Sequence, residues 1–196
     1  PLRLQLRTGH TAARSQRTSQ PALHQPNAGI IPGDITKAGA PARPLWDTEI
    51  NYGIAGPGGT PHVTIDGEKA AAWTAITYLD NNRLGVDRSY WYFWAAGSPL
   101  VGIQMFDGTA GATGYTTVQS WIKDTQVGCN TGSPNVCNVT GRYPAQIAWT
   151  DSGSAPFTVP AFATTMCDVM NACSPVAPGS QITIGDSPKW FGTVAG

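Results

Sequence analysis

The 196-residue sequence has few charged residues and no net charge. Charged residues make up 12% of the chain, roughly half of the usual share, and 12 basic residues balance 12 acidic ones. A sequence pI of about 7.3 lacks the basic footprint of a nucleic-acid-binding protein. No apolar run approaches the roughly 18 residues that a membrane-spanning helix needs. We therefore expect no nucleic-acid partner and no membrane span.

Aromatic residues are missing from the first 43 positions, and all eighteen lie beyond them. Residues 1–40 also carry four Arg, one Lys and two His against one acid, with no helical or strand period. Such a segment buries too little apolar area to offset its ordering entropy. We expect residues 1–42 to be disordered or to stem from out-of-frame translation, with a linker, an Arg-rich transit-like segment and a basic arm as alternatives. With no initiating Met or signal-peptide core, the chain is expected to be a fragment or a processed product.

A CxxC pair is also absent, so the four cysteines do not have the spacing of a zinc site. They lie at positions 129, 137, 167 and 173, which allows three disulfide pairings. We predict two local disulfides, Cys129–Cys137 and Cys167–Cys173, with four buried free thiols as the alternative. Two disulfides indicate an oxidising compartment, and we expect a secreted or cell-wall-associated protein that holds no metal or cofactor.

The most informative stretch runs from Pro44 to Trp94. Two aromatic-rich segments, 43–52 and 89–94, flank a Gly/Pro-rich loop and an alanine-rich helix expected from Asp66. Parallel strands need a crossover of this kind, so the pattern predicts a strand–helix–strand unit. The near-continuous aromatic run 89–94 is typical of a strand buried on both faces. Trp73 is expected to pack the helix on the sheet.

Residues 46–53, Trp-Asp-Thr-Glu-Ile-Asn-Tyr-Gly, resemble the seventh strand of the clan A retaining glycoside hydrolases, the (β/α)8 cellulase, xylosidase and glucosidase relatives. In that family a Trp-x-Thr/Ser-Glu-x-Gly-like strand presents the catalytic nucleophile, which implies this role for Glu49. The strand ending at Trp94 resembles the eighth strand, whose tryptophan forms part of the sugar subsite. The likeness covers roughly residues 44–124, with a weaker one over 140–192 to the β-domain of secreted actinobacterial members.

The resemblance implies a retaining glycosidase, which needs two carboxyl groups about 5–5.5 Å apart. Glu49 supplies one, and the acid/base of the family usually follows an Asn on the fourth strand. No Asn-Glu pair occurs here, so we expect the chain alone to be inactive. Tyr92 and Asn51 are further candidates for sugar contact. As alternatives, Glu49 is a solvated acid on an edge strand and Trp94 is a core residue. Asp47 either supports Glu49 or is solvated.

From position 126 onward short β-prone runs alternate with turns, which predicts an antiparallel β-sandwich. Residues 146–150 alternate in polarity, so we expect one face of that strand to be solvated. The expected fold is α/β plus all-β: the last units of a (β/α)8 barrel in 43–125, then a β-sandwich domain in 126–196. Asn138-Val139-Thr140 is a glycosylation sequon, a motif that is common by chance.

Two further hypotheses compete with the glycosidase. The chain is a non-catalytic carbohydrate- or wall-binding module that uses Trp94, Trp149 or the sandwich surface, or it is a structural remnant. A second catalytic Glu on a loop after a strand would favour the enzyme. The sequence indicates a carbohydrate partner but gives neither the sugar, the linkage nor the oligomeric state.

Overall fold

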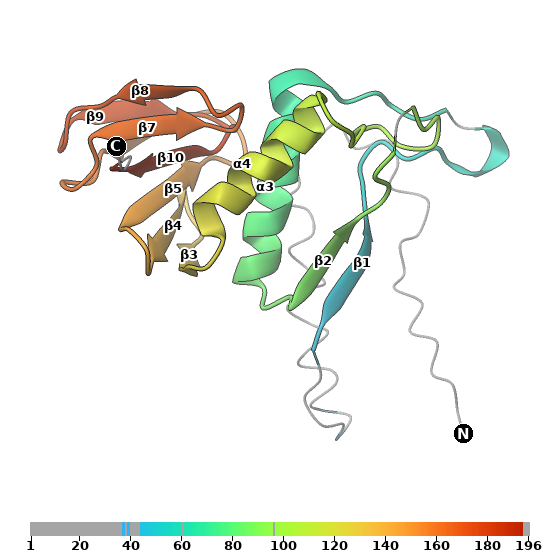
Figure 1. Ribbon diagram of the computed structural model, residues 1–196, viewed down its shortest axis with the longest axis horizontal. Coiled ribbons are helices and arrows are strands. Elements are labelled where there is room, and N and C mark those ends of the chain that lie inside the picture. Colours follow the sequence, from blue (N-terminus) through green and yellow to red (C-terminus); the bar gives the residue numbers. More distant parts are fainter. Residues whose placement is uncertain (1–36, 38, 40–43, 60, 96, 194–196) are drawn as a thin grey trace.

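The computed structural model describes residues 37, 39, 44–59, 61–95 and 97–193 (Figure 1). The predicted segment 1–42 therefore lies outside the described residues, apart from Lys37 and Gly39. The described part mixes helices with a larger number of strands. Within it, no helix is long and apolar enough to cross a membrane.

The first unit is two parallel strands joined through a helix. Strand β1 (Trp46–Ile50) pairs in parallel with β2 (Arg88–Trp91), and α3 (Gly67–Arg83) forms the crossover. This confirms the predicted strand–helix–strand unit. A single 3-10 turn, η3 (Pro57–Gly59), lies in the loop that follows β1. Strand β2 is shorter than predicted, because it ends at Trp91 and leaves Tyr92 to Trp94 in the following loop.

Helix α4 (Ala110–Ile122) packs closely against α3. Thr109 caps its start, where the hydroxyl accepts a hydrogen bond from the backbone N–H of Ala112 at 3.3 Å. Gly114 makes the close approach possible, because a Cβ at this position would lie 2.4 Å from the carbonyl oxygen of Ala71. Trp73 is buried on α3 as predicted, with 3% of its surface exposed.

The remaining strands are antiparallel. Six of them form one sheet in the order β3-β4-β5-β10-β7-β8, and β6 pairs separately with β9. Their bounds are β3 (Gln126–Asn130), β4 (Asn135–Thr140), β5 (Ala145–Trp149), β6 (Ala155–Thr158), β7 (Thr165–Asp168), β8 (Cys173–Pro175), β9 (Gln181–Ile184) and β10 (Lys189–Gly192).

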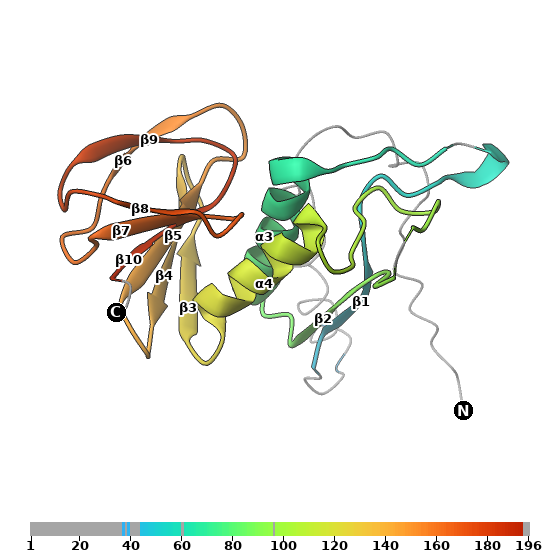
Figure 2. The same ribbon diagram turned by 45° about the horizontal axis from the view of Figure 1, so that its top comes forward.

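The six-stranded sheet is a middle layer, with the helices on one side and β6 and β9 on the other (Figures 1 and 2). Ile147 and Trp149 of β5 belong to the core that contains the residues of α3. Ala148 and Phe191 face the other way and pack with Phe157 of β6. The prediction that one face of β5 is solvated is therefore wrong, and Trp149, 2% exposed, is not a surface residue.

The chain leaves α4 and enters β3 at the predicted domain boundary between residues 125 and 126. The two sides of this boundary nevertheless share one hydrophobic core. Residues of α3 and α4 and residues of β4, β5 and β7 share one buried cluster. The division of the chain into two domains at this point stays a prediction. What the structure adds is that each part covers apolar surface of the other.

Both predicted disulfides are present. Cys129 bonds to Cys137 across β3 and β4, and Cys167 bonds to Cys173 across β7 and β8. Each pair occupies directly opposite positions of an antiparallel ladder. No cysteine remains free, which excludes the alternative of buried thiols.

Candidate functional site

Glu49 lies near the carboxyl end of β1, and its side chain is exposed. The next residue, Ile50, is buried and pairs with Trp91 of β2. The register between β1 and β2 shifts between Asp47 and Ile50. This irregularity interrupts the alternation of sides that a regular strand has. It leaves Glu49 facing solvent at the end of the parallel pair where α/β folds place their chemistry.

Asp47 does not share the environment of Glu49. It is half-buried, and its carboxylate accepts a hydrogen bond from the Asn81 side chain of α3 at 3.3 Å. Asn81 also donates to the Ser89 hydroxyl at 2.9 Å. The carboxylate of Asp47 therefore helps to fasten β1 and β2 to the helix. The two alternatives predicted for Asp47, support of Glu49 and exposure to solvent, therefore do not describe its side chain.

Asn51 joins the segments that follow both strands. Its side-chain amide donates to the backbone carbonyls of Tyr92 and Ile103, the latter at 3.1 Å. Its side-chain oxygen accepts from the backbone N–H groups of Tyr52 at 2.7 Å and Ile103 at 3.3 Å. Both amide hydrogens are thus committed to backbone. The sugar contact expected for Asn51 stays a prediction, but the structure gives this residue a supporting role.

The loops after β1 and β2 are also held together by backbone hydrogen bonds. The N–H of Gly102 donates to the Tyr52 carbonyl at 2.8 Å, and the N–H of Ala55 donates to the Leu100 carbonyl at 2.9 Å. Within the loop after β1, the N–H of Val63 donates to the Gly53 carbonyl at 2.9 Å. Gly53 has φ +62°, and a Cβ there would lie 2.2 Å from the carbonyl oxygen of Val63. Only glycine fits this crossing, so it fixes the loop beside Glu49.

Aromatic rings are exposed at the same end of the parallel pair. Tyr92, Phe93 and Trp94 are 38%, 41% and 47% exposed. Trp94 meets the Tyr115 ring of α4 edge-on, with centroids 5.4 Å apart, which leaves much of the indole open. The structure thus places Glu49, Tyr92 and Trp94 at one end of the β1–β2 unit. Exposed indole and phenol rings offer an apolar face and a polar edge, which suits a sugar ring.

Behind these rings lies an aromatic layer that the sequence analysis missed. Tyr52 packs edge-on against Trp73 at 5.2 Å, and Trp91 stacks with Tyr78 at 6.4 Å. The Tyr52 hydroxyl lies 2.7 Å from the Thr77 hydroxyl. Burial raises the pKa of the Tyr52 and Tyr78 phenols above its ordinary value. The spacing of Trp73 and Thr77, one turn apart on an alanine-rich helix, was a signal for the helix side of this layer.

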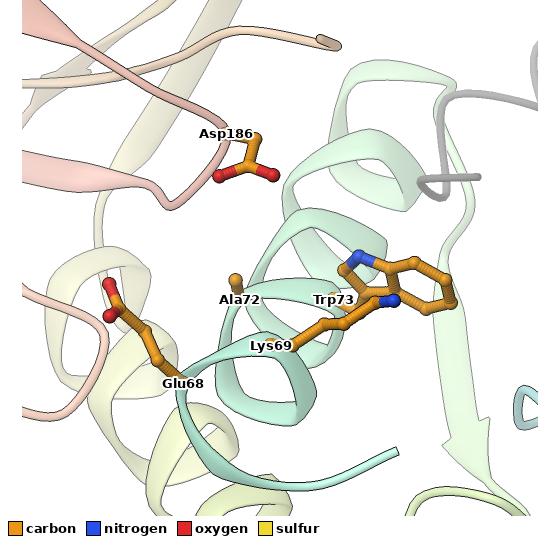
Figure 3. Close-up of a pocket in the computed structure, with 5 residues that line it drawn as sticks. All are labelled: Glu68, Lys69, Ala72, Trp73 and Asp186. Atoms are coloured by element: carbon orange, nitrogen blue, oxygen red, sulfur yellow. The ribbon is translucent and has the colours of Figure 1, made fainter. Parts of the chain in front are cut away.

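A separate hollow lies between α3 and the β9–β10 turn, and it contains none of the predicted site residues (Figure 3). It has a volume of about 210 Å³ and is lined by Glu68, Lys69, Ala72, Trp73 and Asp186. The Lys69 ammonium lies 4.8 Å from the centre of the Trp73 ring. Lys189 of β10 lies 3.6 Å from Glu68. The ion pair between Lys189 and Glu68 joins α3 to the antiparallel sheet, whereas Lys69 and Trp73 both belong to α3. The described residues include no cluster of His, Cys, Asp and Glu side chains able to hold a metal ion.

Comparison with models of known protein families and with curated protein sequences gave no match for this chain.

Proposed function

We propose that residues 43–125 are the C-terminal part of a (β/α)8 retaining glycoside hydrolase, in which Glu49 is the nucleophile and Trp94 and Tyr92 contact the sugar. Residues 126–196 then form its trailing β-sandwich domain. The observation that carries this proposal is the exposed Glu49 carboxylate near the carboxyl end of a parallel strand, with exposed aromatic rings in the segment that follows the strand paired with it. The two disulfides favour a secreted or cell-wall-associated protein.

The open surface of the parallel pair supports the barrel. Within the described residues, β1 and β2 pair only with each other, so each strand has an unpaired edge. Trp46 and Tyr90 are 50% and 44% exposed, although parallel strands are normally covered on both faces. Further parallel strands, as in a closed barrel, would pair these edges and cover the aromatic rings.

The chemistry divides between two carboxyl groups. The ionised Glu49 carboxylate attacks the anomeric carbon while a protonated carboxyl group gives its proton to the leaving oxygen. Water then hydrolyses the covalent glycosyl–enzyme with the second group acting as base, and the product keeps its configuration. The second group belongs to an earlier strand of the barrel, so we expect the 196-residue chain to be inactive alone. The reaction needs no cofactor.

The test uses a protein in which the preceding barrel strands are supplied. Glu49→Gln should lower kcat by several orders of magnitude, because the covalent step is lost. Glu68→Gln, which changes an exposed Glu on α3, is the matched control and should keep full activity. Trp94→Ala should mainly raise KM, by about tenfold, because it removes a stacking surface.

Azide provides a second readout. A Glu49→Ala variant supplied with azide should form a glycosyl azide of inverted configuration, since the anion takes the place of the missing carboxylate. Full hydrolysis by Glu49→Ala without azide would refute the assignment of the nucleophile. Turnover by the isolated chain that Glu49→Gln abolishes would show that the chain holds its own acid/base.

A further inference from the structure

A shallow groove lies on the outer face of β3 and β4, away from Glu49. It is lined by Gln126, Val127, Gly128, Cys129, Asn130, Asn138 and Thr140, with a volume of about 500 Å³. The strand register places Gln126 opposite Thr140, and Gly128 opposite Asn138. The groove therefore runs along the strands, with Gly128 on its floor.

The groove exists because the second sheet covers only part of the first. The alternate residues Cys137 and Val139 of β4 face the helices. The opposite face is covered by β6 and β9 over β5 and β10, through Ala148 and Phe191. Val136 of β4 is partly buried against this second core. The next residues of β4 on the same face, Asn138 and Thr140, are exposed and polar. The outer face of β3 and of the adjoining half of β4 is therefore not covered by the second sheet.

The side chains on this face are neutral and able to form hydrogen bonds. Gln126, Asn130 and Asn138 carry amides, Thr140 carries a hydroxyl, and no charged residue lines the groove. Gln146 of β5 donates to the side-chain oxygen of Asn138 at 2.9 Å. This bond fixes the orientation of the Asn138 amide.

The turn after β4 carries an exposed aromatic ring, which is not one of the residues that line the groove. Tyr143, 43% exposed, lies in the turn that joins β4 to β5, three residues beyond Thr140. The Arg142 guanidinium lies 5.6 Å from the centre of this ring. Asn130 lies four positions after Gln126, so the strand face between them is about 14 Å long. The combination of neutral amides, a hydroxyl group and an open glycine floor matches a polyhydroxylated ligand without charge, since amides form hydrogen bonds with hydroxyl groups.

We propose that the β3–β4 groove is a binding site for a neutral oligosaccharide chain. Helices α3 and α4 lie between strands β3 and β4 and the strand β1 that carries Glu49 (Figure 2), and binding in the groove requires no catalysis at Glu49. Charged polymers are not the expected ligand, because the groove offers no ion pair. The groove would hold a polysaccharide to the protein. This binding proposal does not depend on the proposed glycosidase activity.

The test is affinity electrophoresis of the 196-residue chain in native gels that contain xylan, hydroxyethylcellulose, laminarin or galactomannan. At least one of these neutral polysaccharides should retard the protein. Gly128→Glu should abolish the retardation, because the new side chain fills the floor of the groove. No heavy atom lies within 4 Å of a Cβ built at Gly128, so this variant should fold. Asn138→Ala should weaken binding about two- to tenfold, the loss expected for one or two hydrogen bonds.

Two control variants keep the outcomes separate. Thr183→Ala changes an exposed residue of β9 and should bind as the unmodified chain does. Trp94→Ala reports separately on the sugar contact proposed at the Glu49 end. Retardation lost in Trp94→Ala but kept in Gly128→Glu would overturn the groove while supporting sugar contact at the Glu49 end. Retardation by none of the four polysaccharides would overturn the groove and leave the glycosidase test unaffected. Far-ultraviolet circular dichroism confirms that each variant is folded.

Discussion

Replacing Asn51 should separate the two loops that border Glu49. Its side chain makes four hydrogen bonds to backbone groups of Tyr52, Tyr92 and Ile103, and it is half-buried. Asn51→Ala removes all four. At roughly 1 kcal/mol for each bond, with water replacing the more exposed ones, we expect a loss of about 2–3 kcal/mol in the free energy of unfolding.

Asn51→Asp tests the same geometry through pH. The carboxylate would face the carbonyl oxygens of Tyr92 and Ile103, which previously accepted the amide hydrogens. This repulsion raises the pKa of the new carboxyl group in the folded state above its unfolded value of about 3.9. The destabilisation is therefore fully present above the folded-state pKa. It disappears as the pH falls below the unfolded value, because the protonated acid again donates to a carbonyl.

Urea unfolding followed by fluorescence at pH 7 and pH 3.5 measures both variants against the unmodified chain. Asn82→Ala, an exposed asparagine on α3, is the control and should change stability by less than about 0.5 kcal/mol. An Asn51→Ala chain as stable as this control would refute the supporting role. A penalty in Asn51→Asp that is equal at both pH values would refute the assigned donors.

Three further predictions concern the packing. Gly114→Ala should destabilise by about 1–3 kcal/mol, because the overlap with the backbone of Ala71 outweighs the gain of roughly 1 kcal/mol in helix propensity; a rise in melting temperature would contradict the close helix contact. Trp149→Phe should cost about 1–3 kcal/mol in urea unfolding, whereas a surface tryptophan would tolerate the change. Reduction should remove roughly 2–3 kcal/mol for each disulfide, measured by denaturation with and without reductant; unchanged stability would show that the loops do not constrain the unfolded chain.

Local sequence patterns predicted the crossover helix and the place of Glu49 near the end of its strand. The breakers around 53–61 and the alanine-rich run after Asp66 locate the crossover helix, so the parallel pairing of β1 with β2 follows from chain connectivity. The disulfides were predictable too, because cysteines six or eight residues apart in β-prone segments fit short hairpins. These features depend on neighbours along the chain.

Features that depend on layering were not predictable. Residues 146–150 alternate in polarity as a strand with one solvated face does, yet β6 and β9 cover the second face of β5. The shift between Asp47 and Ile50 depends on how β1 meets β2, which no local pattern encodes. Asn51 was expected to contact sugar because of its place beside Glu49, whereas its hydrogen bonds depend on a loop about fifty residues away.

The two disulfides lie at opposite borders of the six-stranded sheet. Strands β3 and β8 are its edge strands, and each is bonded covalently to its inner neighbour. Edge strands are where sheets peel open, exchange partners with other copies and expose themselves to proteases. Because each edge strand is cross-linked to its neighbour, neither can separate completely from the sheet without reduction. Such a sheet is suited to long residence outside the cell, where no chaperone refolds a strand that has come loose.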